Sequence, residues 1–315
     1  MGCPVLNDKS IVVVGPGAMG TMITALLMLS GRCCPVLLDH NQERAARLDS
    51  TLFTLELQRT KLSVPIQVTA EPGSLAGVQT VLLCVKSFQV DDALSFARPI
   101  LKDDTLVVFL QNGMSHLPAA AELAGQCPVA LAVTALGSTL IAPGHVRHGG
   151  SGITRMGSFP KPATAQSEAR LESLAACLTD ASLETRTVSA ILDWVWLKLL
   201  VNVGINPLTV VLNCPNGGLL QSTAARSLME AAVKEGETVA RAEGITLPED
   251  PLARTIQVCR DTAANISSML QDVRAHRRTE IESITGEIVK RAAVHGIPVP
   301  VNRDLLDQVR KCAVS

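Results

Sequence analysis

The sequence predicts two domains, an α/β domain with a doubly wound parallel sheet followed by an all-helical domain. The chain of 315 residues is long enough for two domains of ordinary size. In the first half, short β-branched runs alternate with helical stretches, a pattern typical of a parallel sheet covered by helices. After about residue 185, long helical patterns dominate and strand signals are weak. We therefore expect domains over 1–188 and 189–315.

The α/β domain is predicted from elements that alternate along the first half. Ile11–Val14 is wholly β-branched, which favours a strand buried on both faces. The apolar helix after it is expected to stop near Gly31. In chain order, the sequence predicts strands over 11–14, 36–38, 64–69, 78–85 and 105–110, with helices over 21–29 and 42–49.

The second domain is predicted from helical stretches that glycine and proline separate. These helices are expected over 190–206, 222–243, 250–267 and 279–294. Thr279 and Glu282 have the spacing of a capping box, in which the two side chains bond backbone N–H groups at the start of a helix. Gly296 suits the end of that helix.

The composition is that of a folded protein without a nucleic-acid surface. Apolar residues make up 47% of the chain and charged residues 18%, which argues against disorder. The net charge of -1 leaves no basic surplus for a phosphate backbone, and five Phe, two Trp and no Tyr leave no stacking platform. No apolar run approaches the roughly 20 residues of a membrane span, and residues 1–10 lack a secretory pattern. The nine cysteines form no CxxC pair, so we expect no metal site and a reduced, cytoplasmic setting.

A glycine-rich turn between the first strand and the first helix carries the first functional prediction. Gly15, Gly17 and Gly20 form the pattern G-x-G-x-x-G. The first glycine permits a tight turn, the second lets the backbone approach a pyrophosphate, and the third lets helix pack on strand. The start of the helix offers free N–H groups to the phosphates. The cofactor-binding residues expected here are Gly15, Pro16, Gly17, Ala18, Met19 and Gly20. A glycine-rich turn without a ligand is the alternative.

Polar residues at the ends of other predicted strands extend this cofactor site. Asp39 ends the second strand, where a carboxylate can accept hydrogen bonds from the ribose hydroxyls and would repel a 2′-phosphate, so Asp39 favours NAD. His40 and Arg44 oppose this interpretation because their charges could offset a phosphate, and a solvated loop aspartate is the alternative. Lys86 and Asn112 each follow a strand, at the edge where such sheets bind ligands. A surface lysine and a turn asparagine are the alternatives there.

A polar stripe on an apolar helix carries the second functional prediction. Lys198, Asn202 and Asn206 are spaced by four residues, so they share one face of the helix expected over 190–206. The other faces carry Val, Leu, Ile and Trp, which indicates a largely buried helix. A lysine there must pair, shift its pKa downward or reach a water-filled cleft, and each outcome suits an acid–base group. The alternative is a solvent face from which Lys198 extends into water.

Motifs along almost the whole chain resemble those of the ketopantoate reductases, the 2-dehydropantoate 2-reductase family. The matching segments are 15–20, 85–86, 111–114, 198–202, 205–209, 213–217, 265–272, 279–281 and 295–298. The matches over 198–209 and 265–272 are much more specific than the glycine turn. The resemblance implies an N-terminal Rossmann domain, an all-helical C-terminal domain and an active site between them.

The resemblance also implies roles for individual residues. Lys198 matches the catalytic lysine, and Glu280 matches the acidic residue near the nicotinamide ribose, which we count as the second catalytic residue. The implied substrate-binding residues are Asn202, Asn206, Asn216 and Ser268, and the implied cofactor contacts are Lys86, Asn112 and Ser138. Relatives that use NADPH commonly carry a basic residue where this chain has Asp39. NADP is therefore the family default, while Asp39 favours NAD.

The expected activity is reduction of a 2-keto acid by hydride transfer from NADPH or NADH, most specifically of ketopantoate to pantoate in pantothenate and CoA biosynthesis. Lys198 would protonate the carbonyl oxygen, and Asn202, Asn206 and Ser268 would hold the substrate. An NAD-linked D-2-hydroxyacid dehydrogenase of the same superfamily and a non-catalytic dinucleotide-binding sensor are the alternatives. The expected partner is a small-molecule 2-keto acid, with no nucleic acid and no membrane. The apolar helices of the second half could form the face of a homodimer.

Overall fold

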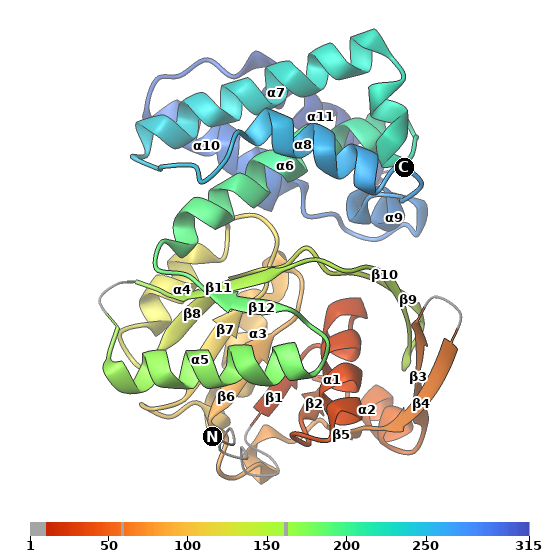
Figure 1. The fold of residues 1–315 in the computed structure, drawn as a ribbon, viewed down its shortest axis with the longest axis vertical. Coiled ribbons are helices and arrows are strands. Elements are labelled where there is room, and N and C mark those ends of the chain that lie inside the picture. The colour runs from red at the N-terminus through yellow and green to blue at the C-terminus, as the bar shows by residue number, and fades with distance from the viewer. Residues whose placement is uncertain (1–10, 58–59, 161–162, 315) are drawn as a thin grey trace. The chain divides into compact units, whose positions relative to one another are not determined.

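A computed structural model describes residues 11–57, 60–160 and 163–314 (Figure 1). By its internal contacts the chain divides into two compact units. The first comprises Met1–Gln111 and Leu117–Ile191, and the second comprises Asn112–His116 and Leu192–Ser315. The short segment Asn112–His116 therefore belongs with the second unit, although it lies between two stretches of the first along the chain.

The first unit is built on an eight-stranded sheet with the order β12-β11-β8-β7-β6-β1-β2-β5. Its strands are β1 (Ile11–Val14), β2 (Val36–Leu38), β5 (Gln67–Thr69), β6 (Thr80–Leu83), β7 (Leu106–Phe109), β8 (Val129–Val133), β11 (Thr154–Ser158) and β12 (Thr185–Thr187). The neighbours from β5 to β8 are parallel. Strand β11 pairs antiparallel with β8 and parallel with β12. The predicted fold class is confirmed, and the antiparallel pairing at one edge is an addition.

Helices of the first unit share one hydrophobic core with this sheet. Helix α1 (Ala18–Ser30) follows β1, and α5 (Ala165–Asp180) crosses in front of the sheet in Figure 1. Leu27 of α1, Leu174 of α5 and Val13 of β1 are buried in the same cluster. The remaining helical segments of this unit are α2 (Gln42–Asp49), α3 (Val90–Ala97), α4 (Leu117–Leu123) and the 3-10 turns Pro72–Ser74, Ser87–Gln89 and Arg98–Ile100.

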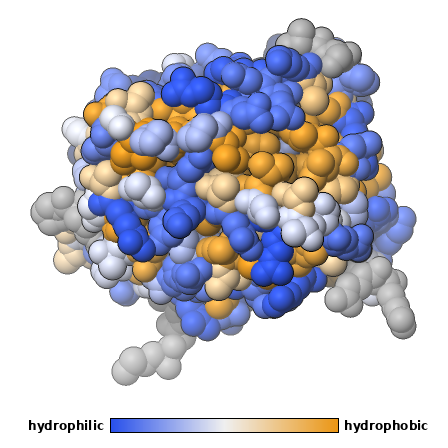
Figure 2. Space-filling view, turned by 90° about the horizontal axis from the view of Figure 1, so that it is seen from above, coloured by the Kyte–Doolittle hydropathy of each residue, from blue (hydrophilic) through white to orange (hydrophobic). Residues whose placement is uncertain are grey.

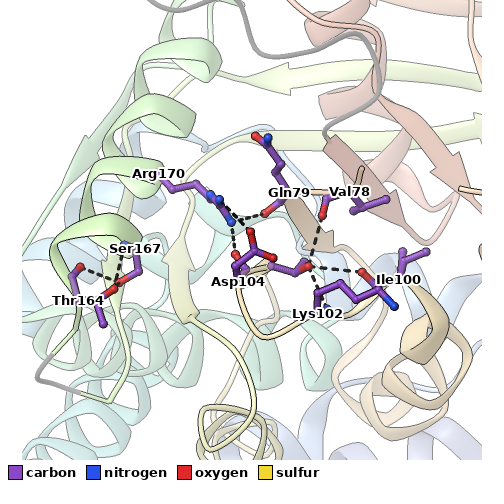
Figure 3. Close-up of polar contacts among 9 residues, drawn as sticks. Val78, Gln79, Ile100, Lys102, Asp104, Thr164, Ser167 and Arg170 are labelled. Carbon is purple, nitrogen blue, oxygen red and sulfur yellow. Dashed lines mark hydrogen bonds and ion pairs between the residues drawn. The ribbon is translucent and has the colours of Figure 1, made fainter. Parts of the chain in front are cut away.

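Polar contacts fix the points at which β6 and β7 begin (Figure 3). The Arg170 guanidinium on α5 donates to the carbonyl oxygens of Asp104 and Gln79 and pairs with the Asp104 carboxylate. The Thr105 hydroxyl donates to the carbonyl of Val78 at 3.3 Å. These bonds satisfy backbone groups just before each strand starts. They hold the amino-terminal edge of the sheet, while ligands of such sheets bind at the opposite, carboxyl-terminal edge.

A second sheet of four strands packs beside α1. Its order is β4 (Thr60–Pro65), β3 (Leu52–Leu57), β10 (His145–Gly150) and β9 (Gly137–Ala142). Phe53, Leu55 and Val146 are fully buried on its inner face. The single strand predicted over 64–69 is wrong, because it consists of β4 and β5 in different sheets. Pro65 ends β4, since proline has no N–H to continue the ladder.

The second unit is helical apart from its connecting segments. Its elements are α6 (Ile191–Val211), a 3-10 turn (Asn216–Leu220), α7 (Thr223–Ala242), α8 (Pro251–Asp261), α9 (Ser268–Arg274), a π-helical turn (Glu282–Gly286), α10 (Glu287–Val294) and α11 (Pro300–Val314). The helix predicted over 250–267 is wrong in its length, because α8 stops at Asp261. The carbonyls of Ala263 and Asn265 instead accept the N–H groups of Gly217 and Asn216. Backbone pairing with a distant loop therefore ends this helix.

The helix predicted over 279–294 begins with a π-helical turn rather than with a capping box. Glu282 bonds Arg310 of α11, with 2.7 Å between Oε1 and Nε, and no side chain caps the turn. The end of α10 agrees with the prediction, since Gly296 has a φ of +64°. A π-helical turn leaves a backbone carbonyl without its usual partner one turn later, so that carbonyl can bond elsewhere.

Helix α6 forms the centre of the second unit. Of the described helices it alone has the length and apolar composition of a membrane span, and 83% of that stretch is buried inside the protein. Trp196 is buried and lies 5.7 Å from the Arg291 guanidinium. A Cβ on Gly204 would lie 2.7 Å from Val233 of α7 and 2.9 Å from Thr255 of α8. Both helices therefore pack directly on the backbone of α6 at Gly204.

Candidate functional site

The glycine turn after β1 has the geometry of a phosphate site. Gly15 has a φ of +104°, and a Cβ there would lie 2.8 Å from Val85. A Cβ on Gly20 would lie 2.0 Å from the carbonyl oxygen of Gly15. A Cβ on Gly17 would meet no atom within 4 Å. Gly15 and Gly20 are therefore required by the fold, whereas Gly17 borders open space that a ligand can enter.

Helix α1 begins at this turn with free hydrogen-bond donors. Gly17 is the N-cap and has no side chain to satisfy them, and the first helical bond runs from Thr21 N to Gly17 O at 2.9 Å. Within the described residues, the N–H groups of Ala18, Met19 and Gly20 have no acceptor. An anion is favoured there by these donors and by the helix dipole. The turn therefore fits a dinucleotide pyrophosphate.

Asp39 follows β2, as predicted, but its carboxylate is engaged inside the protein. The Arg44 guanidinium donates to both oxygens, at 2.5 Å to Oδ2 and 2.6 Å to Oδ1, and Asn41 N donates to Oδ1 at 3.0 Å. Asp39 is fully buried, while about a third of the Arg44 side chain is exposed. His40 Nδ1 lies 3.8 Å from Asp39 Oδ1 and is largely exposed. Arg44 and His40, rather than Asp39, therefore present polar atoms at the surface here.

The other predicted cofactor contacts of the first unit lie in two places. Lys86 follows β6 just before the turn Ser87–Gln89, at the carboxyl end of a strand that pairs with β1. Ser138 lies on β9 in the four-stranded sheet, paired in register with His148. Lys86 is therefore at the sheet edge that the prediction requires, and Ser138 belongs to the sheet that covers α1.

Lys198, Asn202 and Asn206 lie along one side of α6, as their spacing predicts. Both asparagines are buried and Lys198 is half-buried. In the described parts of the chain, none of the three side chains makes a hydrogen bond or an ion pair. Burial lowers the pKa of the Lys198 ammonium below its usual value, and the positive charge of Arg254 on α8 lowers it further. Within the described residues, Lys198 therefore has no counter-ion, and the two asparagine amides beside it have no hydrogen-bond partner. Such a group is suited to bind a polar ligand, and the lysine is suited to release a proton.

The segment Asn112–His116 brings a predicted cofactor contact to a predicted catalytic residue. Met114 N donates to the carbonyl of Ser283 at 2.9 Å, inside the π-helical turn. Gly113 has a φ of +77°, and a Cβ there would lie 2.0 Å from that same oxygen. Asn112 Nδ2 consequently lies 3.5 Å from Glu280 Oε2, a long contact between two residues 168 positions apart. The sequence contained no signal for this contact.

The remaining predicted substrate residues lie around the loop before α9. Asn216 donates from Nδ2 to the Thr262 hydroxyl at 2.9 Å, and its Oδ1 is buried. Ser267 caps α9 and bonds the Thr209 hydroxyl at 2.6 Å, while the predicted Ser268 is exposed at the next position. Asn216 is thus bonded into the fold, and Ser268 is open to a ligand.

Comparison with known proteins identifies the family. Residues 11–161 match the model for "Ketopantoate reductase PanE/ApbA", and residues 190–313 match the model for its C-terminal part. A 2-dehydropantoate 2-reductase of Halobacterium salinarum is 36% identical over 95% of this chain and 97% of its own. The chain belongs to the ketopantoate reductase family. The 2-dehydropantoate 2-reductase of Vibrio cholerae is 33% identical over 96% of this chain and 97% of its own.

Solved structures agree with this membership. A PanE/ApbA family ketopantoate reductase from Ralstonia eutropha JMP134 has a TM-score of 0.86 and 30% identity, covering 97% of this chain and 98% of that one. D-mandelate dehydrogenase with NADH and anilino(oxo)acetate has a TM-score of 0.85 at 24% identity, covering 97% and 98%, which shows a shared fold alone. The predicted family and enzyme class, an oxidoreductase that uses a nicotinamide cofactor, are confirmed.

Proposed function

We propose that this protein is a 2-dehydropantoate 2-reductase, which reduces ketopantoate to pantoate and so supplies pantothenate and CoA biosynthesis. The observation that carries the proposal is the Lys198 side chain. It is half-buried on α6 in line with the amides of Asn202 and Asn206, and its pKa is lowered from the usual value of a lysine. The names of the relatives from Halobacterium and Vibrio support the same substrate. They do not favour a D-2-hydroxyacid dehydrogenase, and a non-catalytic sensor would have no use for Lys198.

The glycine turn is proposed to hold the cofactor. Gly17 leaves room for the pyrophosphate, and the N–H groups of Ala18, Met19 and Gly20 donate to it. Pro16 and Lys86 border the same edge of the sheet. When bound, the nicotinamide supplies the hydride that the keto carbon accepts.

Lys198 is proposed to be the general acid. Negative charge develops on the keto oxygen as its carbon is reduced, and the ammonium stabilises that charge and donates the proton. A lowered pKa suits this role because a weaker hold on the proton makes the ammonium a better acid at neutral pH. Asn202 and Asn206 donate hydrogen bonds that hold the substrate, and Ser268 contributes its exposed hydroxyl. Glu280, with Asn112 beside it, is proposed to bond the cofactor ribose or to orient Lys198.

NADPH is proposed as the preferred cofactor. The support is the ion pair in which Arg44 neutralises Asp39 and covers both of its oxygens. A neutralised carboxylate repels a 2′-phosphate weakly, while the exposed parts of Arg44 and His40 can attract one. That Asp39 itself accepts from the ribose, with NAD as the result, stays the competing prediction. A cytoplasmic location is also proposed, in line with the scattered single cysteines, and the homodimer stays a prediction.

The test measures oxidation of NADPH and of NADH by the purified enzyme, side by side, with ketopantoate. Pyruvate, 2-oxoisovalerate and benzoylformate serve as competing keto acids. We expect the highest kcat/KM with ketopantoate and NADPH. Efficient reduction of another keto acid without reduction of ketopantoate would refute the substrate. A higher kcat/KM with NADH would return the cofactor preference to the Asp39 prediction.

A further inference from the structure

The polar side of α6 continues beyond Asn206 to a buried hydroxyl that the activity described above does not use. Thr209 follows Lys198 by eleven residues and Asn202 by seven, so at about 3.6 residues per turn it lies within about 20° of both around the helix axis. Thr209 is fully buried, and its hydroxyl contacts the Ser267 hydroxyl at 2.6 Å. The loop before α9 therefore packs on the side of α6 that carries the lysine and the asparagines.

The hydrogen bonds around this pair of hydroxyls form a chain with one direction. The Thr209 hydroxyl donates to the carbonyl oxygen of Asn206 at 2.8 Å, because a carbonyl can only accept. The Ser267 hydroxyl must then donate to Thr209 Oγ1. Ser267 Oγ in turn accepts the N–H of Leu270 at 3.1 Å as the N-cap of α9. The chain of bonds thus connects the first turn of α9 with the turn of α6 that carries Asn206.

The other end of the same loop is also held by hydrogen bonds. The N–H of Asn216 donates to the carbonyl of Asn265 at 3.0 Å, and Asn216 Nδ2 donates to the Thr262 hydroxyl at 2.9 Å. The loop is therefore anchored near its start by Asn216 and at its end by the bond from Ser267. Ser268 directly follows that last anchor and is exposed. A serine held in this way has few positions to sample before a ligand binds.

We propose that Thr209 and Ser267 are positioning residues of the substrate site, which fix Ser268 relative to Asn206. This inference rests on the proposed function, in which Ser268 and Asn206 bond the keto acid. Both positioning hydroxyls are buried and bonded to each other, so they act through their neighbours and not on the substrate. Two short side chains from different elements can bond one small ligand together only when their separation is held closely.

The substitution Thr209→Val tests the proposal, because valine keeps the branched shape and leaves the Ser267 hydroxyl without its acceptor. Thr255→Val is the matched control. Thr255 is also fully buried, its hydroxyl donates to the Pro251 carbonyl at 2.7 Å, and it contacts α6 at Gly204, on the opposite side of that helix. We expect T209V to raise the KM for ketopantoate by about 5- to 30-fold and to leave the KM for NADPH within about two-fold of wild type.

The conservative and control variants decide whether the hydroxyl itself matters. Thr209→Ser keeps the hydroxyl, so its KM for ketopantoate should stay close to wild type. T255V should lose stability in urea unfolding, as T209V does, but keep both KM values. An unchanged KM in folded T209V, or an equal rise in T255V, would overturn the proposal. If T209V does not fold, the double variant T209V/S267A removes both hydroxyls and leaves neither unpaired, and it should show the same rise in KM.

Two further measurements follow the path from Thr209 to Ser268. Hydrogen exchange at residues 263–270 should become faster in T209V and not in T255V, because the N–H of Leu270 loses a fixed acceptor. In a Ser268→Ala background, T209V should add little to the KM, since the side chain through which it acts is absent. Unchanged exchange in T209V, or an undiminished effect on KM in the S268A background, would contradict the proposed role.

Binding without turnover separates this proposal from the proposed function. Calorimetric titration with ketopantoate, in the presence of NADP+, which has no hydride to give, compares wild type, T209V and T255V. Weaker binding in T209V alone supports the positioning role even if the enzyme fails to reduce ketopantoate. Equal binding by all three proteins, or no binding by wild type, overturns it and leaves the reductase assay to be judged by itself.

Discussion

A pair of glycine substitutions should separate the fold of the cofactor turn from its function. At Gly17 a Cβ meets no atom within 4 Å, and the residue has a φ of -74°, so alanine fits the folded protein. At Gly20 a Cβ would lie 2.0 Å from the Gly15 carbonyl oxygen, whereas real contacts stay above 3.0 Å, so the turn must open by about 1 Å. Gly17→Ala should therefore impair binding, and Gly20→Ala should impair folding.

The magnitudes follow from the two environments. Gly17→Ala replaces a glycine N-cap, which should cost about 1 kcal/mol of unfolding free energy or less. Because its methyl group occupies the open space, the Kd for NADPH should rise by about 10-fold or more. Gly20→Ala overpacks a tight turn against backbone, which should cost about 1–3 kcal/mol or more. Urea unfolding measures the free energy of unfolding of both variants, and fluorescence titration measures the Kd for NADPH. Wild-type NADPH affinity in a folded Gly17→Ala protein would refute the assignment of this turn to the pyrophosphate.

Three other predictions concern charge. Lys198→Ala should lower kcat by about 100-fold or more with folding intact, and wild-type turnover in that variant would remove its role as general acid. Arg44→Ala should raise the KM for NADPH and leave the KM for NADH nearly unchanged, whereas equal effects on both would argue against a 2′-phosphate contact. Burial lowers the pKa of His116 from 6.5 to about 4, so its contribution to stability is complete above about pH 6.5 and is lost as pH falls toward 4. Between about pH 7 and 5, the free energy of unfolding should fall by about 2 kcal/mol because of His116. In His116→Gln, urea unfolding should show a smaller fall over the same pH range.

The strands that are buried on both faces were predictable, and the second sheet was not. Ile11–Val14 and the segment 81–83 of β6 are continuous apolar runs, which are typical of a central strand in a sheet covered on both faces. In contrast, β9 and β10 are half-exposed and contain Gly137, Gly149 and Gly150, so neither alternation nor a continuous apolar run marks them. Their place is decided by packing on α1, which is a property of the folded chain.

Some features of the candidate site were also predictable from the sequence, and others were not. The Lys198 stripe was predictable because helical periodicity alone places three polar residues on one face of α6. The approach of Asn112 to Glu280 was not, because it depends on a π-helical turn that turns the Ser283 carbonyl toward Met114.

The surface of the helical unit adds a contrast to its interior. Figure 2 shows apolar and polar residues mixed over the face seen from above. Leu228 of α7 and Val294 of α10 are large apolar residues that remain exposed, at 41% and 79%. Single exposed apolar side chains of this kind are usual on folded proteins and identify no partner by themselves.

The attachment of Asn112–His116 to the helical unit has a consequence for biosynthesis. The segment leaves the ribosome before the turn at Glu282–Gly286 on which it docks, and 168 positions separate Asn112 from Glu280. At about 5–20 residues per second, translation of that interval takes on the order of 10–30 s. During this delay the apolar Met114 has no place to dock. A nascent chain that already contains the whole nucleotide-binding turn is therefore still unable to place Asn112, and the contact between Asn112 and Glu280 forms only after the turn Glu282–Gly286 has been synthesised.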